Sequence, residues 1–368
     1  VWRFCSMLPT TPLHNIQLWK AEVIDPSSEE GLIRFATLKS KGLIHSEIDT
    51  LESQVVELAI IRNPSLKDNP LGLTKAISSI IGNKNWDTYG RWVLFPWNGC
   101  AVRLLPPASF VEVRTNRNRD RITSQEQELL SEKTVGIVGL SVGHSAAVTI
   151  AMERSAGTIR IADFDDLELS NLNRIRAGVF ELGLPKWLIA ARTIAETDPY
   201  INVEVFPDGV KEENIDSFMN QCDVVIDACD GLAAKAMIRM EALERKIPVI
   251  MDTSDRGMLD IERYDILNST DGFLHGRIDS ETMTSLRKRS HWDTETLNLF
   301  IDFSTASERG QISLAKMGTE LVGWPQLYSD VASGSAFAAE AARRLLLGED
   351  IPDSRLYLEI DEQLSVKN

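Results

Sequence analysis

The chain has 368 residues, of which 43% are apolar and 25% are charged, as in an ordinary globular protein. This length can bury a full core and predicts one large domain with an additional module. The net charge of −15 argues against a surface that binds bulk nucleic acid or anionic membranes, although it permits a basic pocket for a triphosphate.

No apolar run approaches the roughly 20 residues needed to cross a bilayer. The cysteines are few, irregularly spaced and without a CxxC pair, which excludes a zinc ribbon and a disulfide scaffold. We therefore expect no membrane association, no zinc and a reducing, cytoplasmic environment. The four cysteines are Cys5, Cys100, Cys222 and Cys229.

Residues 1–115 form a tryptophan-rich module whose pattern indicates no role. An acidic helical stretch is expected near residues 46–61. Two strands are expected around the Pro106–Pro107 break, with the sequences CAVRLL (100–105) and FVEVRT (110–115).

Residues 116–368 are expected to form the second domain, in which strands and helices alternate up to about residue 264. This alternation predicts an α/β fold with a Rossmann-like, doubly wound, mostly parallel sheet. Ligands of such sheets lie at the carboxyl ends of the strands, near the topological switch point. The expected strands are 135–138, 158–162, 202–206, 223–228 and 248–252, and the expected helices are 143–154, 186–196, 214–219 and 232–246.

The end of the chain is less regular. Residues 265–323 include a long polar stretch that we interpret as a lid or substrate-facing region. A helix rich in small residues is expected over 329–347, and SRLYLEID (354–361) is expected to form an edge strand.

A glycine-bearing turn follows the first strand of the second domain. Gly139 and Gly143 are present, but Ser141 and His144 stand where GxGxxG would place its other glycines. The helix that follows offers free backbone N–H groups to a phosphate, and Asp163, at the end of the next strand, can take ribose hydroxyls. The turn alone also fits a tight connection that binds nothing.

Further motifs follow in a fixed order over residues 117–265. They are NRDR at 118–121, DFDD at 163–166 with SNLNR at 170–174, GLPK at 183–186 and DACD at 227–230. Together they resemble the signatures of the ThiF/MoeB/ubiquitin-activating superfamily. The resemblance implies an ATP-dependent adenylyltransferase that converts a carboxylate into an acyl-adenylate and releases pyrophosphate.

The resemblance also implies site residues, cofactors and partners. ATP and Mg²⁺ would be the cofactors, and a homodimer would be the assembly. Arg119 or Arg121 would act as an arginine finger, in trans in that dimer. Nucleotide contacts would come from Gly139, Ser141, Gly143, Asp163 (ribose), Asp165, Asn171, Arg174 and Lys186, the last two also catalytic, and Asp230 would be catalytic and hold Mg²⁺.

Each charged residue has a simpler interpretation. Arg174 and Lys186 fit solvated cations at helix ends, and Asp230 fits the cap of the helix near Leu232. Lys235 is interpreted as a cation of the nucleotide pocket. The interpretation rests on a similar D-x-x-x-x-K spacing in the threonylcarbamoyladenosine dehydratase branch.

The chain also departs from the family pattern. Ser141 adds a side chain where backbone usually approaches the nucleotide, and Gly231 replaces a common asparagine. No cysteine lies in the crossover segment after Asp252, and Cys229 fits a buried structural thiol. A thioester relay is therefore disfavoured.

Several functions remain open. The carboxylate could belong to a ubiquitin-like protein, a peptide or a small molecule such as a threonylcarbamoyl group on tRNA. A catalytically silent nucleotide-binding subunit and an NAD-dependent oxidoreductase are the alternatives. The chain could also be part of a longer protein with a flavin nitroreductase-like domain.

Overall fold

A computed structural model describes residues 19–82, 85–267, 272–289 and 294–364. Cys5 and the start of the predicted N-terminal module lie outside these ranges, as do short parts of the expected 265–323 region. The chain divides into two compact units, Val1–Arg117 and Asn118–Asn368.

The first unit contains a four-stranded sheet in the order β1-β3-β4-β2. β2 runs parallel to β4, and the other neighbours are antiparallel. Leu51, Val55 and Leu58 form part of one buried cluster, and Ile24 and Leu94 lie in a second. The elements are β1 (Glu22–Ile24), α1 (Glu29–Ser40), β2 (Ser46–Asp49), α2 (Leu51–Arg62), α3 (Pro70–Ile81), β3 (Arg91–Phe95), β4 (Cys100–Leu104) and α4 (Pro107–Arg114).

The expected strand at 100–105 is confirmed by β4, but the expected strand at 110–115 is wrong, because these residues belong largely to α4. Pro107 occupies the first helical position, where its missing N–H costs nothing. Phe110 and Val113, three residues apart, both pack against the cluster that includes α2. Tertiary packing therefore overrides the β-branched alternation of this segment.

The second unit is built on a seven-stranded sheet in the order β11-β10-β9-β8-β5-β6-β7. The five strands from β9 to β7 are mutually parallel, whereas β10 and β11 run antiparallel at one edge. This is the predicted Rossmann-like α/β fold. The strands are β5 (Thr134–Val138), β6 (Thr158–Ala162), β7 (Asn202–Phe206), β8 (Val224–Asp227), β9 (Val249–Thr253), β10 (Met258–Glu262) and β11 (Ser354–Tyr357).

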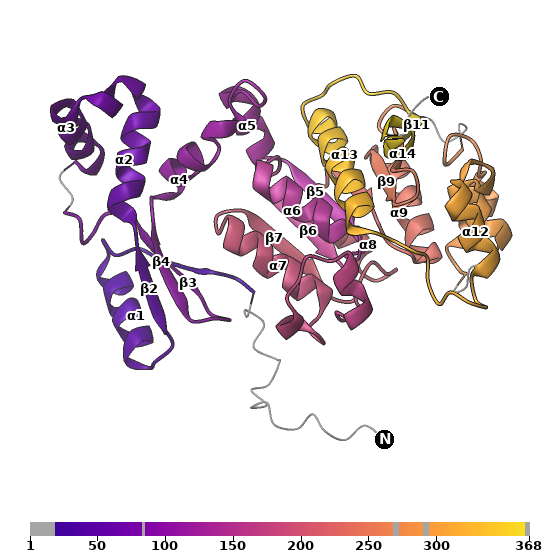
Figure 1. The fold of residues 1–368 in the computed structure, drawn as a ribbon, viewed down its shortest axis with the longest axis horizontal. Helices are drawn as coiled ribbons and strands as arrows, with labels where there is room; N and C mark the ends of the chain where they lie inside the picture. Colours follow the sequence, from indigo (N-terminus) through magenta and orange to yellow (C-terminus); the bar gives the residue numbers. More distant parts are fainter. Residues whose placement is uncertain (1–18, 83–84, 268–271, 290–293, 365–368) are drawn as a thin grey trace. The chain divides into compact units, whose positions relative to one another are not determined.

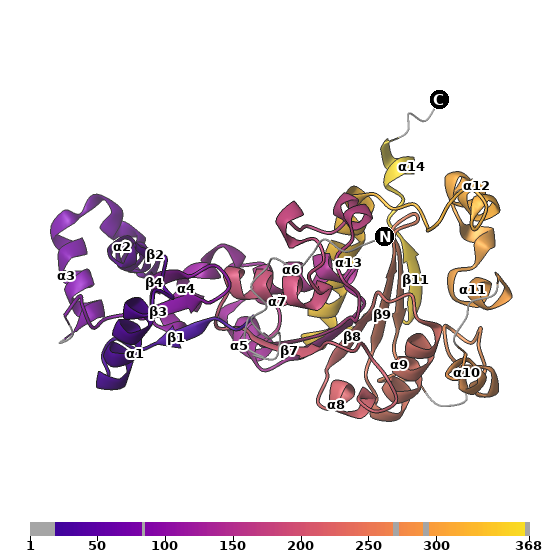
Figure 2. The ribbon, with the colours of Figure 1, turned by 90° about the horizontal axis from the view of Figure 1, so that it is seen from below.

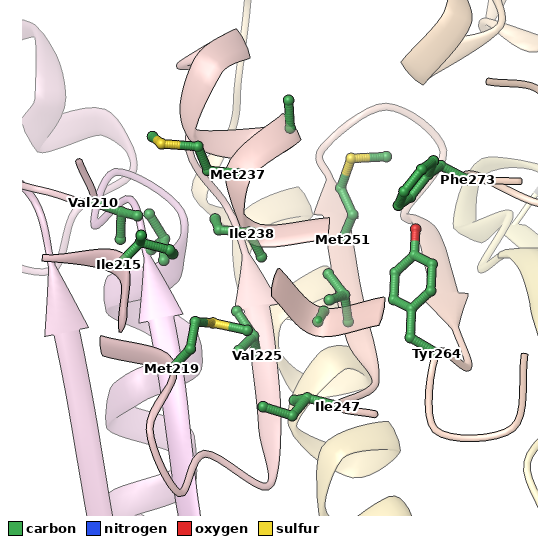
Figure 3. Close-up of a cluster of buried hydrophobic side chains, with 14 of the residues drawn as sticks. Val210, Ile215, Met219, Val225, Met237, Ile238, Ile247, Met251, Tyr264 and Phe273 are labelled. Carbon is green, nitrogen blue, oxygen red and sulfur yellow. The ribbon is translucent and has the colours of Figure 1, made fainter. Parts of the chain in front are cut away.

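Helices cover both faces of this sheet (Figures 1 and 2). One face carries α6 (Gly143–Glu153), α7 (Lys186–Thr197) and α13 (Tyr328–Leu346), and the other carries α8 (Ile215–Met219) and α9 (Leu232–Arg245). Figure 3 shows the core under α8 and α9, where Met219, Ile238 and Met251 lie among buried apolar side chains. The sheet is therefore doubly wound.

The predicted parallel strands and their intervening helices are confirmed within one residue at each end. The helix ends have a local cause, since Arg154 and Lys246 adopt left-handed backbone conformations that stop α6 and α9. The edge strand is confirmed by β11, but α14 (Ile360–Leu364) begins where that strand was expected to continue.

The polar region before α13 forms α10 (Ser280–Leu286), α11 (Thr294–Ile301) and α12 (Glu308–Lys316). This region is attached to the sheet at the turn between β9 and β10. There the Asp255 carboxylate accepts hydrogen bonds from the backbone N–H and hydroxyl of Ser307, 2.9 and 2.6 Å away. The side chain of Arg256 lies over the ring of Tyr357.

Candidate functional site

The turn after β5 requires glycine at its first position. Gly139 has φ +85°, and a Cβ there would lie 2.5 Å from the carbonyl oxygen of Ala228, on the neighbouring strand end. His144 stands at the position of the last glycine of GxGxxG. It is buried, and burial lowers its pKa to about 4. The turn thus brings the start of α6 against the end of β8.

Asp163 ties this turn to the end of β6. Its Oδ2 accepts a hydrogen bond from the backbone N–H of Leu140 at 2.5 Å, and its Oδ1 accepts one from Asp165 at 2.8 Å. Burial raises the pKa of Asp163, against these two hydrogen bonds, which lower it. An ionised carboxylate has about four acceptor positions, so two remain for ribose hydroxyls.

Arg174 meets the same turn. It follows η3 (Leu169–Asn173), and its Nε donates to the Ser141 hydroxyl oxygen over 3.2 Å. The guanidinium also donates to the carbonyl oxygen of Ser170 over 3.2 Å. The side chain of Ser141, a departure from the glycine pattern, therefore holds a cation beside the start of α6.

Asn171 and Lys186 are both buried. The Asn171 side-chain oxygen accepts a hydrogen bond from the backbone of Glu168 at 3.0 Å, which is a local structural role. Lys186, the first residue of α7, forms an ion pair with Asp165 at 2.9 Å. Lys186 is therefore not a solvated helix-end cation, and any phosphate contact would compete with Asp165.

The two aspartates of the DACD motif have different environments. Asp227 is fully buried and lies 3.0 Å from Lys235 Nζ and 2.6 Å from Arg239. Burial alone would raise the pKa of Asp227, but the two cations outweigh it and lower the pKa to about 2. Asp230 is exposed in the short connection between β8 and α9.

This ion cluster corrects one hypothesis and adds residues that the motifs did not indicate. Lys235 is held by Asp227 inside the protein and is not a pocket cation. Arg239 also contacts Glu262 of β10 at 2.7 Å. The sequence did contain a signal for Arg239, which lies four positions after Lys235 and therefore on the same face of a helix.

Cys229 lies beside the same cluster. Its Sγ is 3.2 Å from Asp227 Oδ1. Burial raises the pKa of the Cys229 thiol further above neutral pH. A protonated thiol is a poor nucleophile, so its environment suits a structural residue.

Arg119 and Arg121 are exposed and lie in a turn before α5 (Ser124–Ser131). This turn is anchored at the carboxyl end of α6, where the Asn118 side chain donates to the carbonyl oxygen of Glu153 over 2.8 Å. The glycine turn is at the other end of that helix, about 15 Å away for 11 residues. The structure does not bring these arginines to the glycine turn of their own chain.

In the described part of the chain, no group of three or more His, Cys, Asp or Glu side chains is arranged to hold a metal ion. Mg²⁺ is commonly held by one or two carboxylates together with substrate phosphates and water, and an exposed Asp230 fits that mode. Within the same residues, no helix has the length and apolarity needed to cross a membrane.

A doubly wound sheet, a glycine turn against a helix start and a carboxylate at the end of the second strand define a Rossmann-like nucleotide-binding domain. The ThiF family model matches residues 115–257. Residues 115–257 therefore form a ThiF-family domain, as the motifs of this region indicated.

Three relatives illustrate the relationship. An uncharacterized protein, MT1398, of Mycobacterium tuberculosis (strain CDC 1551 / Oshkosh) is 43% identical over 276 residues, covering 74% of this chain and 38% of that protein. The tRNA threonylcarbamoyladenosine dehydratase of Bacillus subtilis (strain 168) is 31% identical, covering 41% and 60%. The sulfur carrier protein ThiS adenylyltransferase of Escherichia coli (strain K12) is 29% identical, covering 36% and 53%.

The chain thus spans less than two thirds of each of these relatives. Adenylyltransferases occur among its relatives, and this is the general kind of enzyme to which the family relationship points.

Proposed function

We propose that this protein is an ATP-dependent adenylyltransferase that activates a carboxylate as an acyl-adenylate without a thioester relay. The observation that carries the proposal is the meeting of Asp163 and Arg174 at the glycine turn. Asp163 offers acceptors for a ribose and Arg174 offers a cation for phosphate, at the turn that leads into a helix.

The residues divide the chemical work. Asp163 binds the ribose, while Gly139, Ser141 and Gly143 bring backbone close to the phosphates. Asn171 positions the η3 turn, and Arg174 neutralises charge as the substrate carboxylate attacks the α-phosphorus. Lys186 exchanges its Asp165 partner for a phosphate oxygen.

Magnesium completes the proposed site. Asp230 would hold Mg²⁺, which neutralises charge on the phosphates and helps pyrophosphate to leave. The substrate is the carboxylate of a ubiquitin-like protein, a peptide or a small molecule. We further propose a cytoplasmic homodimer, with no general affinity for nucleic acid because of the acidic net charge.

Calorimetric titration with MgATP, and separately with NADH, tests the proposal. We expect MgATP to bind the wild-type protein and Asp230→Ala to weaken binding at least tenfold. Asp216→Ala is the matched control, because Asp216 is exposed and pairs with Arg245 at the far end of α9. Pyrophosphate exchange with glycine-terminated peptides, and with the same peptides as C-terminal amides, then tests activation of a free carboxylate.

Other results would contradict the proposal. Binding of NADH without MgATP would favour an oxidoreductase. Binding of MgATP with no exchange for any carboxylate would favour a silent nucleotide-binding subunit. Unchanged binding by Asp230→Ala would remove that residue from the metal site.

Arg119 and Arg121 provide a separate test of the dimer. If they act in trans, a mixture of Asp230→Ala with the double variant Arg119→Ala/Arg121→Ala regains activity, because each mixed dimer contains one intact site. After subunit exchange we expect about a quarter of wild-type pyrophosphate exchange, from half of the dimers with one site each. Each variant alone should show no recovery of pyrophosphate exchange. If the mixture of the two variants also shows none, action in trans is excluded.

A further inference from the structure

Asp252 is a buried carboxylate that the roles assigned above do not use. It lies one residue before the end of β9 and is 7% exposed. Neither of its oxygens forms a hydrogen bond of normal geometry with the described residues, although the Ser335 hydroxyl lies close enough to lower its pKa. Buried polar atoms are almost always paired, so a carboxylate with two open oxygens indicates a partner that arrives from outside.

The order of the sheet places Asp252 at one end of the proposed site. Along the carboxyl edge come Asp163 at β6, the glycine turn at β5, Asp230 after β8 and Asp252 at β9. The ribose acceptor is therefore at one end and Asp252 at the other, beyond the carboxylate proposed for the metal. We place the acyl group and its acceptor at this second end, because the first end is taken by the ribose.

The side chain of Asp252 lies on the α6 and α13 face of the sheet. Met251, the preceding residue, belongs to the core under α8 and α9 (Figure 3), and successive strand residues point to opposite faces. A Cβ on Gly334 of α13 would lie 2.4 Å from Asp252 Oδ1, so glycine at this position lets the helix backbone pack closely against the carboxylate. The next residue, Ser335, donates to the carbonyl oxygen of Val142, just before α6, over 3.4 Å.

Charged groups on β8, β10 and α13 around Asp252 pair with other residues, and His144 of α6 stays neutral because burial lowers its pKa to about 4. Asp227 of β8 pairs with Lys235 and Arg239. On β10, Asp260 pairs with Arg355, and Glu262 pairs with Arg239. On α13, Arg343 pairs with Glu340. Burial raises the pKa of Asp252 to about 7, while the Ser335 hydroxyl opposes this shift. Its charge is therefore free to respond to an incoming ligand.

We propose that Asp252 binds the amine of an acceptor that takes the acyl group from the adenylate, and that it removes the proton of that amine. This inference rests on the proposed adenylyltransferase function and names the chemical class of its final nucleophile. An amine suits an open carboxylate because its N–H donors carry the positive charge that the protein does not supply. A thiol is a weak donor by comparison.

The transfer step is balanced without a further reagent. The bound ammonium first releases one proton to solvent. The lone pair of the resulting neutral amine then forms a bond to the acyl carbon, and the bond from that carbon to the AMP oxygen breaks. The electron pair of the broken bond leaves with AMP. The nitrogen becomes positively charged as it bonds, and its proton passes to the Asp252 carboxylate. A base whose pKa lies near the working pH is suited to this task.

Binding of ethylammonium tests the site without knowledge of the acyl substrate. Ligand-observed NMR at pH 6 and pH 8 would measure its affinity, with potassium chloride at equal concentration as the ionic control. Because burial raises the pKa of Asp252 to about 7, more of this carboxyl is ionised at pH 8 than at pH 6. We expect wild-type affinity to rise close to tenfold, Asp252→Asn to lose binding and Asp216→Asn to behave as wild type.

Ser335→Ala provides a second variant that keeps Asp252. Loss of the hydroxyl that favours the charged form should move the onset of ethylammonium binding to higher pH. Equal affinity at pH 6 and pH 8, or binding that survives Asp252→Asn, would overturn the inference. Amine binding in a protein that fails to bind MgATP would instead overturn the proposed function and leave the amine site standing.

Discussion

Arg239→Met is expected to destabilise the second unit by about 3–5 kcal/mol, because it removes the cation of buried Glu262 and one of the two cations of buried Asp227. Arg239 is fully buried and bridges Asp227 and Glu262 at 2.6 and 2.7 Å. Burial would lower the pKa of Arg239, but the two carboxylates outweigh it and raise it. After the change Asp227 retains Lys235. Among the described residues, Glu262 then keeps only hydrogen bonds from the hydroxyl of Tyr264 and the N–H of Leu274.

Urea unfolding followed by far-UV circular dichroism would measure the loss. Arg245→Met is the matched control on the same helix, because Arg245 pairs with the exposed Asp216 and should contribute less than about 1 kcal/mol. Adding Glu262→Gln to Arg239→Met should recover part of the loss, since it removes the unpaired charge. Equal losses for Arg239→Met and Arg245→Met would show that the buried cluster does not stabilise this unit.

Arg174→Ala is expected to lower pyrophosphate exchange by about 10²–10³-fold, the usual effect of removing one group that stabilises developing charge. The guanidinium is held by Ser141 and by the carbonyl oxygen of Ser170, so it is positioned before the nucleotide arrives. The affinity for MgATP should also fall, since the same cation contacts the bound phosphates.

Arg174→Lys separates charge from geometry, because lysine keeps the charge but lacks the planar fork of donors. We expect it to recover MgATP affinity more than exchange activity. Arg344→Ala is the control for loss of an arginine, because Arg344 lies on the exposed side of α13 and pairs with Glu349. A fall of less than about threefold for Arg174→Ala would place this residue outside the catalytic step.

The motifs identified the candidate site residues, but they did not predict the environments of these residues. The DACD motif pointed to Asp230, yet the buried cluster around Asp227 could not be read from spacing, because Glu262 comes from a strand that was not expected. Ser141 looked like a defect in the glycine turn, and only the fold shows that it holds Arg174. In the sequence, Asp252 is one carboxylate in an apolar strand. The sequence therefore shows neither its burial nor its lack of a hydrogen bond of normal geometry.

The sequence by itself determined the parallel sheet, because short apolar runs between amphipathic helices can bury their side chains in few other ways. It also determined the superfamily, through motifs whose residues are local. The tertiary structure decided that FVEVRT is a helix, since packing against α2 outweighed its strand propensity. It likewise decided which charges are buried and paired, because those contacts join residues from separate strands and helices, and folding alone brings these residues together.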